Sequence, residues 1–277
     1  MKGKFRLTLT CILLVLVLVS SALLAVACNN DNTPYNPYDA DNNFDVEVTD
    51  GDDEIEFAPV GFTPSFGVVF YIGMIESPSD YEYLARALAK QGYLTVISKV
   101  RNVNLEGRYD ANISTLAKYP TVKFFLGGHD VGGGLAVRHA MDYAKNNYNV
   151  AGMILYTPRE FTKQQKDENG HFVLDDDNNP VIDHFSIADF SIRTLLLEVD
   201  DELRVDEFKQ TTLEHINNSV TTRYTLENAM STYFSTMSPS SGTDENAVSQ
   251  REKTVEYTLS FLREIARMNV LNVIECD

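Results

Sequence analysis

Gly127-Gly128-His129-Asp130-Val131-Gly132-Gly133 is the stretch that decides the fold of this chain. The apolar run KFFL at 123–126 precedes it, and LAVRHAMDYA at 135–144 follows it with helical spacing. The order is therefore strand, glycine-rich turn, helix. Glycines on both sides of the turn let the helix cross close to the strand, and the turn holds Asp130 in a strained pose at the sheet edge.

The rest of the chain alternates strand and helix patterns around this turn. GVVFYIG (67–73) and RTLLLEV (193–199) are near-continuous apolar runs, which are typical of a parallel sheet covered on both faces. Asp50-Gly51, between apolar segments at 44–48 and 54–57, predicts an N-terminal β-hairpin. Residues 158–191 are too short for a cap domain and read as an excursion above the sheet edge. We therefore expect an α/β fold with a doubly wound, mostly parallel sheet and no cap domain.

Individual elements follow from the same patterns. Strands are expected at 67–73, 93–100, 122–128, 150–157, 194–199 and 221–226. Helices are expected at 80–91, 112–118, 132–146, 205–217 and 245–268.

The N-terminal 27 residues have the pattern of an export signal. Three cations at 2, 4 and 6 precede an apolar run from Leu7 to Leu24, and Ala25-Val26-Ala27 leads into Cys28. A small-residue stretch that ends at a cysteine predicts a lipoprotein in which Cys28 is lipidated, although an ordinary cleaved signal with a coincidental cysteine is the alternative. Several acyl chains on one residue give durable anchoring. This predicts a cell-envelope protein held by lipid on the extracytoplasmic side of a bacterial membrane.

The domain organisation follows from the composition. Residues 1–27 form the predicted signal peptide, 28–43 a tether rich in Asn, Asp and Pro, and 44–277 the α/β domain. The chain has 23 Lys and Arg against 40 Asp and Glu, and three of the cations lie in the signal. Such a surface repels phosphate backbones, so we expect no nucleic-acid partner. The three cysteines provide no disulfide framework.

The strand-turn-helix segment matches the nucleophile elbow G-x-Ser-x-G, with Asp130 at the serine position. With its surroundings, it resembles the α/β-hydrolase superfamily, in particular the small capless type related to dienelactone hydrolases. Three segments carry the resemblance: FYIGMIESPSDYEYLARALAKQGYLTVI, FFLGGHDVGGGLAVRHA and LLLEVDDEL. It extends from about Val46 to Leu262. The resemblance implies an α/β-hydrolase fold and a catalytic triad at the ends of the strands.

The carry-over of that triad is incomplete. Asp130 stands at the position of the nucleophile, Asp201 at that of the acid, and Ser231 at that of the histidine base. No histidine lies downstream of His215, and His129 is the elbow's usual packing or hydrogen-bonding neighbour. The sequence therefore predicts a degenerate triad without a general base.

The resemblance also implies an oxyanion hole built from backbone N–H groups. One comes from Val131, after the nucleophile position, and the other from the loop at Gly73 and Met74. Backbone donors survive changes of side chain, so this part of the site is expected to persist.

Three functions remain open. The first is a pseudoenzyme that binds a small ligand or another envelope protein, because a fold persists after its site is lost. The second is a hydrolase of esters, epoxides or haloalkanes with Asp130 as nucleophile, since GHDVGG resembles the GHD-x-GG of epoxide hydrolases. The third is a divalent-cation site formed by Asp130, Asp201 and Ser231. No cofactor is expected, and no resident metal is assigned.

Overall fold

The computed structural model describes residues 41–73, 75–99, 111–145, 150–159, 162–184, 186–200, 215–237 and 244–274. All of them belong to one compact unit, Tyr38–Asp277. The predicted signal peptide, Cys28, Met74 and Asp201 lie outside the described residues, as does most of the helix expected at 205–217. Across the described ranges, no helix combines the length and apolar character needed to cross a bilayer.

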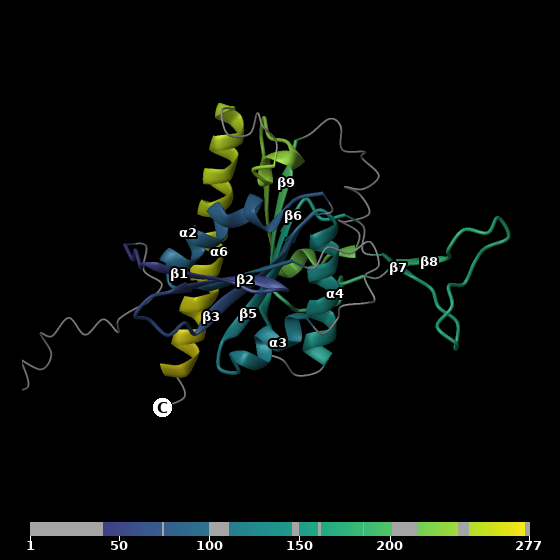
Figure 1. Ribbon diagram of the computed structural model, residues 1–277, viewed down its shortest axis with the longest axis horizontal. Coiled ribbons are helices and arrows are strands. Elements are labelled where there is room, and N and C mark those ends of the chain that lie inside the picture. Colours follow the sequence, from purple (N-terminus) through teal and green to yellow (C-terminus); the bar gives the residue numbers. More distant parts are fainter. Residues whose placement is uncertain are drawn as a thin grey trace, which may run out of the picture. The chain divides into compact units, whose positions relative to one another are not determined.

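Eight strands form the main sheet, in the order β1-β2-β4-β3-β5-β6-β9-β10 (Figure 1). The first two strands are antiparallel to each other and β2 is antiparallel to β4, whereas all the remaining pairs are parallel. This confirms the doubly wound, mostly parallel sheet with an N-terminal hairpin. The strand bounds are β1 Val46–Asp50, β2 Glu54–Pro59, β3 Phe66–Tyr71, β4 Leu94–Ser98, β5 Lys123–His129, β6 Val150–Tyr156, β9 Thr194–Val199 and β10 Thr221–Leu226.

Helices cover both faces of this sheet. On β3, alternate side chains enter two separate cores, with Phe70 in one and Tyr71 in the other. The first core contains residues of α2 and α6, and the second contains residues of α3 and α4. The helix bounds are α2 Glu82–Lys90, α3 Ala111–Lys118, α4 Val131–Lys145 and α6 Glu245–Ile274, with short 3₁₀ helices η1 Pro78–Tyr81, η2 Asn218–Val220 and η3 Ser231–Phe234.

The stretch at 158–191 is more regular than the sequence predicted. It contains β7 Thr162–Gln164 and β8 Ile182–His184, which pair as an antiparallel two-stranded sheet of their own. Its turns are closed by left-handed residues, Gly170 with φ 83° and Asn178 with φ 66°. Asp175 adds a side-chain turn, because its Oδ1 accepts the N–H groups of residues 177 and 179. The expected irregular excursion is therefore a small hairpin separate from the main sheet (Figure 1).

The sheet brings three strand ends together at one edge. Tyr71 of β3 pairs with Gly128 of β5, and His129 at the end of β5 pairs with Tyr156 at the end of β6. Loops that leave these strands in the same direction therefore meet beside residue 130.

Candidate active site

The strand-to-helix turn at Asp130 has the geometry expected of a nucleophile elbow. β5 ends at His129, α4 begins at Val131, and Asp130 between them has φ 53°. Its N–H donates to the carbonyl oxygen of Tyr156 at 3.1 Å, and its own carbonyl oxygen accepts from Gly133 at 3.0 Å. A left-handed backbone is costly for a residue with a Cβ, so the surrounding hydrogen bonds impose this conformation. The turn presents the side chain of residue 130 at the sheet edge.

Two glycines make the turn possible. A Cβ at Gly128 would lie under 3.0 Å from backbone atoms of Gly132, and a Cβ at Gly132 would lie equally close to the carbonyl oxygens of Tyr71 and Ile72. Backbone atoms held in a sheet cannot move aside. The elbow motif is thus preserved for a steric reason that does not depend on the chemistry of residue 130.

The Asp130 carboxylate is paired with a cation that the sequence reasoning missed. Arg159, just after β6, donates from Nε to Oδ1 of Asp130, and its backbone N–H donates to the Asp130 carbonyl oxygen at 3.0 Å. The Asp130 side chain is 19% exposed and that of Arg159 is 56% exposed. The pair could have been anticipated only from the strand order, because β5 and β6 are parallel neighbours whose carboxyl ends lie side by side. The guanidinium thus engages one of the two carboxylate oxygens of Asp130.

Ser231 lies beside the elbow, where the resemblance placed the base. Its Oγ is 3.1 Å from Nε2 of His129 and 2.9 Å from Oγ1 of Thr157. Thr157 is buried and has φ 38°, so a second strained residue stands at this edge. The sequence assigned His129 to packing or hydrogen bonding and predicted no base in the site. The structure places an imidazole nitrogen within hydrogen-bond distance of the Ser231 hydroxyl.

The other nitrogen of His129 faces a phenol and a carboxylate. Nδ1 is 2.6 Å from the hydroxyl of Tyr81 and 3.6 Å from Oε1 of Glu76. All three side chains are buried. Burial, reinforced by the negative charge of Glu76, raises the pKa of Tyr81 well above its usual range, so the phenol keeps its proton. Neither Tyr81 nor Glu76 was singled out from the sequence.

Glu76 occupies the loop that the resemblance assigned to the oxyanion hole. Its Oε2 accepts the N–H of Ile75 at 3.2 Å, and a Cβ added to Gly73 would collide with its carboxylate. The carboxylate therefore packs directly against the Gly73 backbone. Burial raises the pKa of Glu76, and the charge of Asp130 raises it further. Val131, the other expected donor, is the first residue of α4.

No metal centre is found in the part of the chain that the structure describes. It contains no group of three or more His, Cys, Asp or Glu side chains that could hold a metal ion. The cation site considered from the sequence also needs Asp201, which lies outside the described residues. Asp130 and Ser231, its other two members, contact Arg159 and His129 respectively.

A second buried imidazole lies two turns into α4. His139 Nδ1 is 2.6 Å from the hydroxyl of Tyr71, and the two rings are in edge contact. Burial lowers the pKa of His139 to about 4, and the positive charge of Arg138 adds to the effect. The imidazole of His139 is therefore held in its neutral form within the core.

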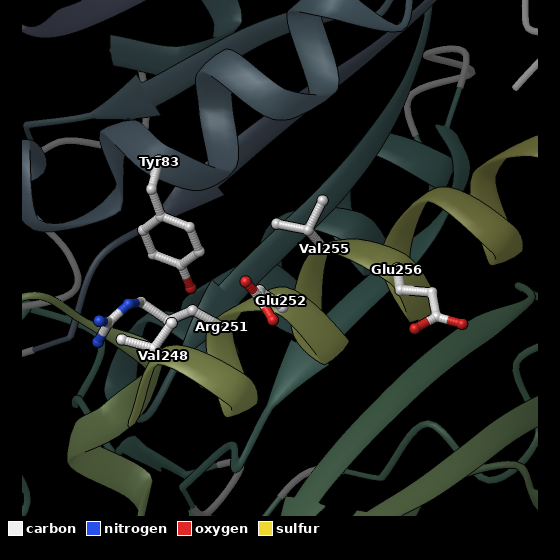
Figure 2. Close-up of a pocket in the computed structure, with 6 residues that line it drawn as sticks. All are labelled: Tyr83, Val248, Arg251, Glu252, Val255 and Glu256. Atoms are coloured by element: carbon white, nitrogen blue, oxygen red, sulfur yellow. The ribbon is translucent and has the colours of Figure 1, made fainter. Parts of the chain in front are cut away.

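A groove of about 440 Å³ lies apart from the elbow, between α2 and α6. Figure 2 shows Tyr83 of α2 facing side chains of α6 across it. Tyr83 donates from its hydroxyl to the carbonyl oxygen of Phe234 at 3.0 Å, which ties the groove wall to η3. The lining residues are Tyr83, Val248, Arg251, Glu252, Val255 and Glu256.

Comparison with known proteins gives one consistent result. Residues 67–175 match the model of a family described as the alpha/beta hydrolase family. The fold matches a predicted CIB-like hydrolase from Thermoplasma acidophilum, with 14% identity, a TM-score of 0.50, and coverage of 80% of this chain and 98% of that one. It also matches an arylesterase, with 12% identity, a TM-score of 0.54, and coverage of 80% and 85%. At these identities the likeness is one of fold. No curated protein matches the sequence.

Proposed function

We propose that this chain, whose residues 67–175 match an alpha/beta hydrolase family model, is a lipid-anchored envelope protein that keeps the hydrolase fold without hydrolysing esters at its elbow. It works by binding a small ligand or another envelope protein. We propose further that its relationship is to the small, capless type of α/β-hydrolase related to dienelactone hydrolases.

The observation that carries the proposal is the position of Glu76. Ester hydrolysis at an elbow needs backbone N–H groups that are free to stabilise a developing oxyanion. Here a buried carboxylate accepts the Ile75 N–H and packs on Gly73, in the loop that would supply one of those donors. An oxyanion formed at residue 130 would therefore face an existing negative charge. Loss of a single oxyanion donor costs about 100- to 1,000-fold in turnover, and repulsion adds to this.

The state of Asp130 supports the same function. A carboxylate that attacks carbon must direct a lone pair at its substrate, and Asp130 directs Oδ1 at the guanidinium of Arg159. The same ion pair disfavours the cation site, because a guanidinium already balances the charge that would attract the metal.

The test restores the triad with and without Glu76. Asp130→Ser with Ser231→His rebuilds two side chains, and adding Glu76→Ala frees the oxyanion loop. We expect p-nitrophenyl acetate hydrolysis to stay at background for the wild type and the double variant, and to rise about 100-fold in the triple variant. Glu82→Ala, at an exposed glutamate of α2, serves as the matched third change and should give no gain. Wild-type turnover that is lost in Asp130→Ala would overturn the proposal.

The anchoring part has its own test. Cys28 follows Ala25-Val26-Ala27, the stretch that predicts lipidation. Cells expressing the wild type should incorporate labelled palmitate into the protein and retain it in the membrane fraction. Cys28→Ala should lose both. Equal labelling of the two chains would show that Cys28 is not the anchor.

A further inference from the structure

We propose that Ser231, His129 and Glu76 form a relocated nucleophile, base and acid, and that Ser231 accepts an acyl or phosphonyl group from a reactive electrophile. This goes beyond the proposed function, because it concerns a hydroxyl other than the elbow side chain. A triad is defined by geometry and roles rather than by sequence position, so residues outside the three inherited positions qualify.

The first half of the relay is the contact between serine and imidazole. Ser231 Oγ lies 3.1 Å from His129 Nε2, within the distance at which a base accepts a hydroxyl proton. Thr157 Oγ1, at 2.9 Å from the same oxygen, can donate to Ser231 and leave the serine proton directed at the ring. The Ser231 side chain is half-buried, whereas His129 is only 1% exposed. The serine is therefore less buried than the imidazole beside it.

The second half is the pairing on Nδ1. Glu76 Oε1 is 3.6 Å from this nitrogen and Tyr81 Oη is 2.6 Å from it, so an Nδ1–H has a phenol oxygen to donate to and a carboxylate beside it. The proposed relay uses the tautomer with the proton on Nδ1, in which Tyr81 Oη accepts that proton and Nε2 accepts the serine proton. A carboxylate next to Nδ1 also stabilises the imidazolium that forms when the serine loses its proton. Glu76 thus stands in the role of the triad acid.

The serine backbone is held in place by a buried amide. Gln250 of α6 accepts the N–H of Met230 with Oε1 and donates from Nε2 to the Met230 carbonyl oxygen, both at 3.0 Å. Gln250 is 3% exposed. On the other side of the site, the rings of His129 and Phe234 lie 5.4 Å apart. Both partners of the hydrogen bond are therefore fixed by packing as well as by each other.

The proposed step balances as follows. The Ser231 oxygen attacks the carbonyl carbon of an ester, its proton moves to His129 Nε2, and the carbon–oxygen bond to the leaving alcohol breaks. The alcohol takes the proton from Nε2, which leaves an acyl-serine and a neutral imidazole. With a fluorophosphonate, a phosphorus–oxygen bond forms, the phosphorus–fluorine bond breaks, and hydrogen fluoride leaves. Because Glu76 occupies the oxyanion loop, both acylation by an ester and hydrolysis of the acyl-serine are slowed, so we expect reactive electrophiles to label Ser231 and esters not to turn over measurably.

The test is covalent labelling of the purified chain with a fluorophosphonate probe, followed by peptide mass spectrometry. We expect a single phosphonyl adduct on Ser231 in the wild type and none in Ser231→Ala. Thr232→Ala, at an exposed hydroxyl in the same 3₁₀ helix, is the matched control and should label as the wild type does. His129→Gln should slow labelling by about 100-fold. Glu76→Gln should slow it less, because Tyr81 still receives the Nδ1 proton.

A second variant keeps the test decisive if His129→Gln does not fold. Ser231→Cys leaves the imidazole in place and should be alkylated by iodoacetamide faster than a free cysteine at pH 6, because an adjacent imidazolium favours the thiolate. An unlabelled wild type would overturn the inference, as would unchanged labelling in a folded His129→Gln. Neither result bears on ester turnover at Asp130, so the failure of this inference can be told from failure of the proposed function.

Discussion

Two tyrosine–histidine pairs lie on opposite faces of the same sheet. Tyr71 and His139 belong to the face covered by α4, whereas Tyr81 and His129 lie on the face covered by α2 and α6. In each pair the phenol oxygen is 2.6 Å from Nδ1 and both residues are buried. The two pairs are nearly identical as isolated contacts.

Their surroundings separate them. The ring of His139 lies 5.4 Å from that of Tyr143 within α4, at a tilted angle, and His139 is affected by the positive charge of Arg138. His129 has a carboxylate at 3.6 Å from one nitrogen and a serine hydroxyl at 3.1 Å from the other. The reactivity open to a buried imidazole therefore depends on the groups around it as well as on its first hydrogen-bond partner. Two predictions test this difference, and a third compares it with the exposed ion pair at the elbow, in order of decreasing effect.

The largest effect is expected from replacing each imidazole by leucine. His129→Leu removes the group that lies between a buried carboxylate, a phenol and a serine, and should cost about 4 kcal/mol of unfolding free energy. His139→Leu leaves the Tyr71 phenol without its imidazole partner and should cost about 2 kcal/mol. Urea denaturation at pH 7 measures both. Equal costs would mean that Glu76 and Ser231 add nothing to the environment of His129.

The second effect concerns acid. The pKa of His139 is about 4 in the folded chain, against an ordinary value of 6.5, so the unfolded state binds more protons between these values. Stability should therefore fall as pH falls through this window, by about 3 kcal/mol at most. His139→Leu should remove this part of the acid sensitivity. The measurement compares denaturation midpoints of the two chains at pH 7 and pH 4.5. Parallel curves would contradict the assignment to His139.

The smallest effect is expected at the solvent side of the elbow. Arg159→Ala removes a half-exposed ion pair with Asp130, and such pairs contribute roughly 0.5 kcal/mol or less. Thermal unfolding in low and in high salt provides the measurement, and the difference from wild type should shrink with added salt. A loss comparable with that of His139→Leu would show that the elbow depends on this pair as much as on its buried neighbours.

Local patterns were sufficient to predict most of the sheet. The strand expected at 194–199 coincides with β9, and the helix expected at 132–146 differs from α4 by one residue at each end. Apolar runs and glycine turns are short-range signals, so they survive without knowledge of the tertiary structure. The elbow was predictable for the same reason, because Gly128 and Gly132 are required sterically.

The side-chain network was not predictable from local patterns. Glu76 and Tyr81 reach His129 from the loop and 3₁₀ helix after β3, and Ser231 reaches it from a 3₁₀ helix far along the chain. Each looks like an ordinary polar residue in its own segment. The family resemblance identified Ser231 only as the residue that replaces the catalytic histidine. Such a comparison of single positions carries no information on the contact between Ser231 and His129. The prediction that the site lacks a base therefore concerned only the position at which the family carries its catalytic histidine.

The clamp between Gln250 and Met230 has a mechanical consequence. The η3 turn that carries Ser231 is attached to α6 through Gln250 and to α2 through the Tyr83 hydroxyl on Phe234. These two helices also form the walls of the groove in Figure 2. A movement of one helix relative to the other would therefore be transmitted through these hydrogen bonds to the turn that carries Ser231. A molecule that binds on α6 in this groove would therefore act on the position of Ser231 Oγ from a distance.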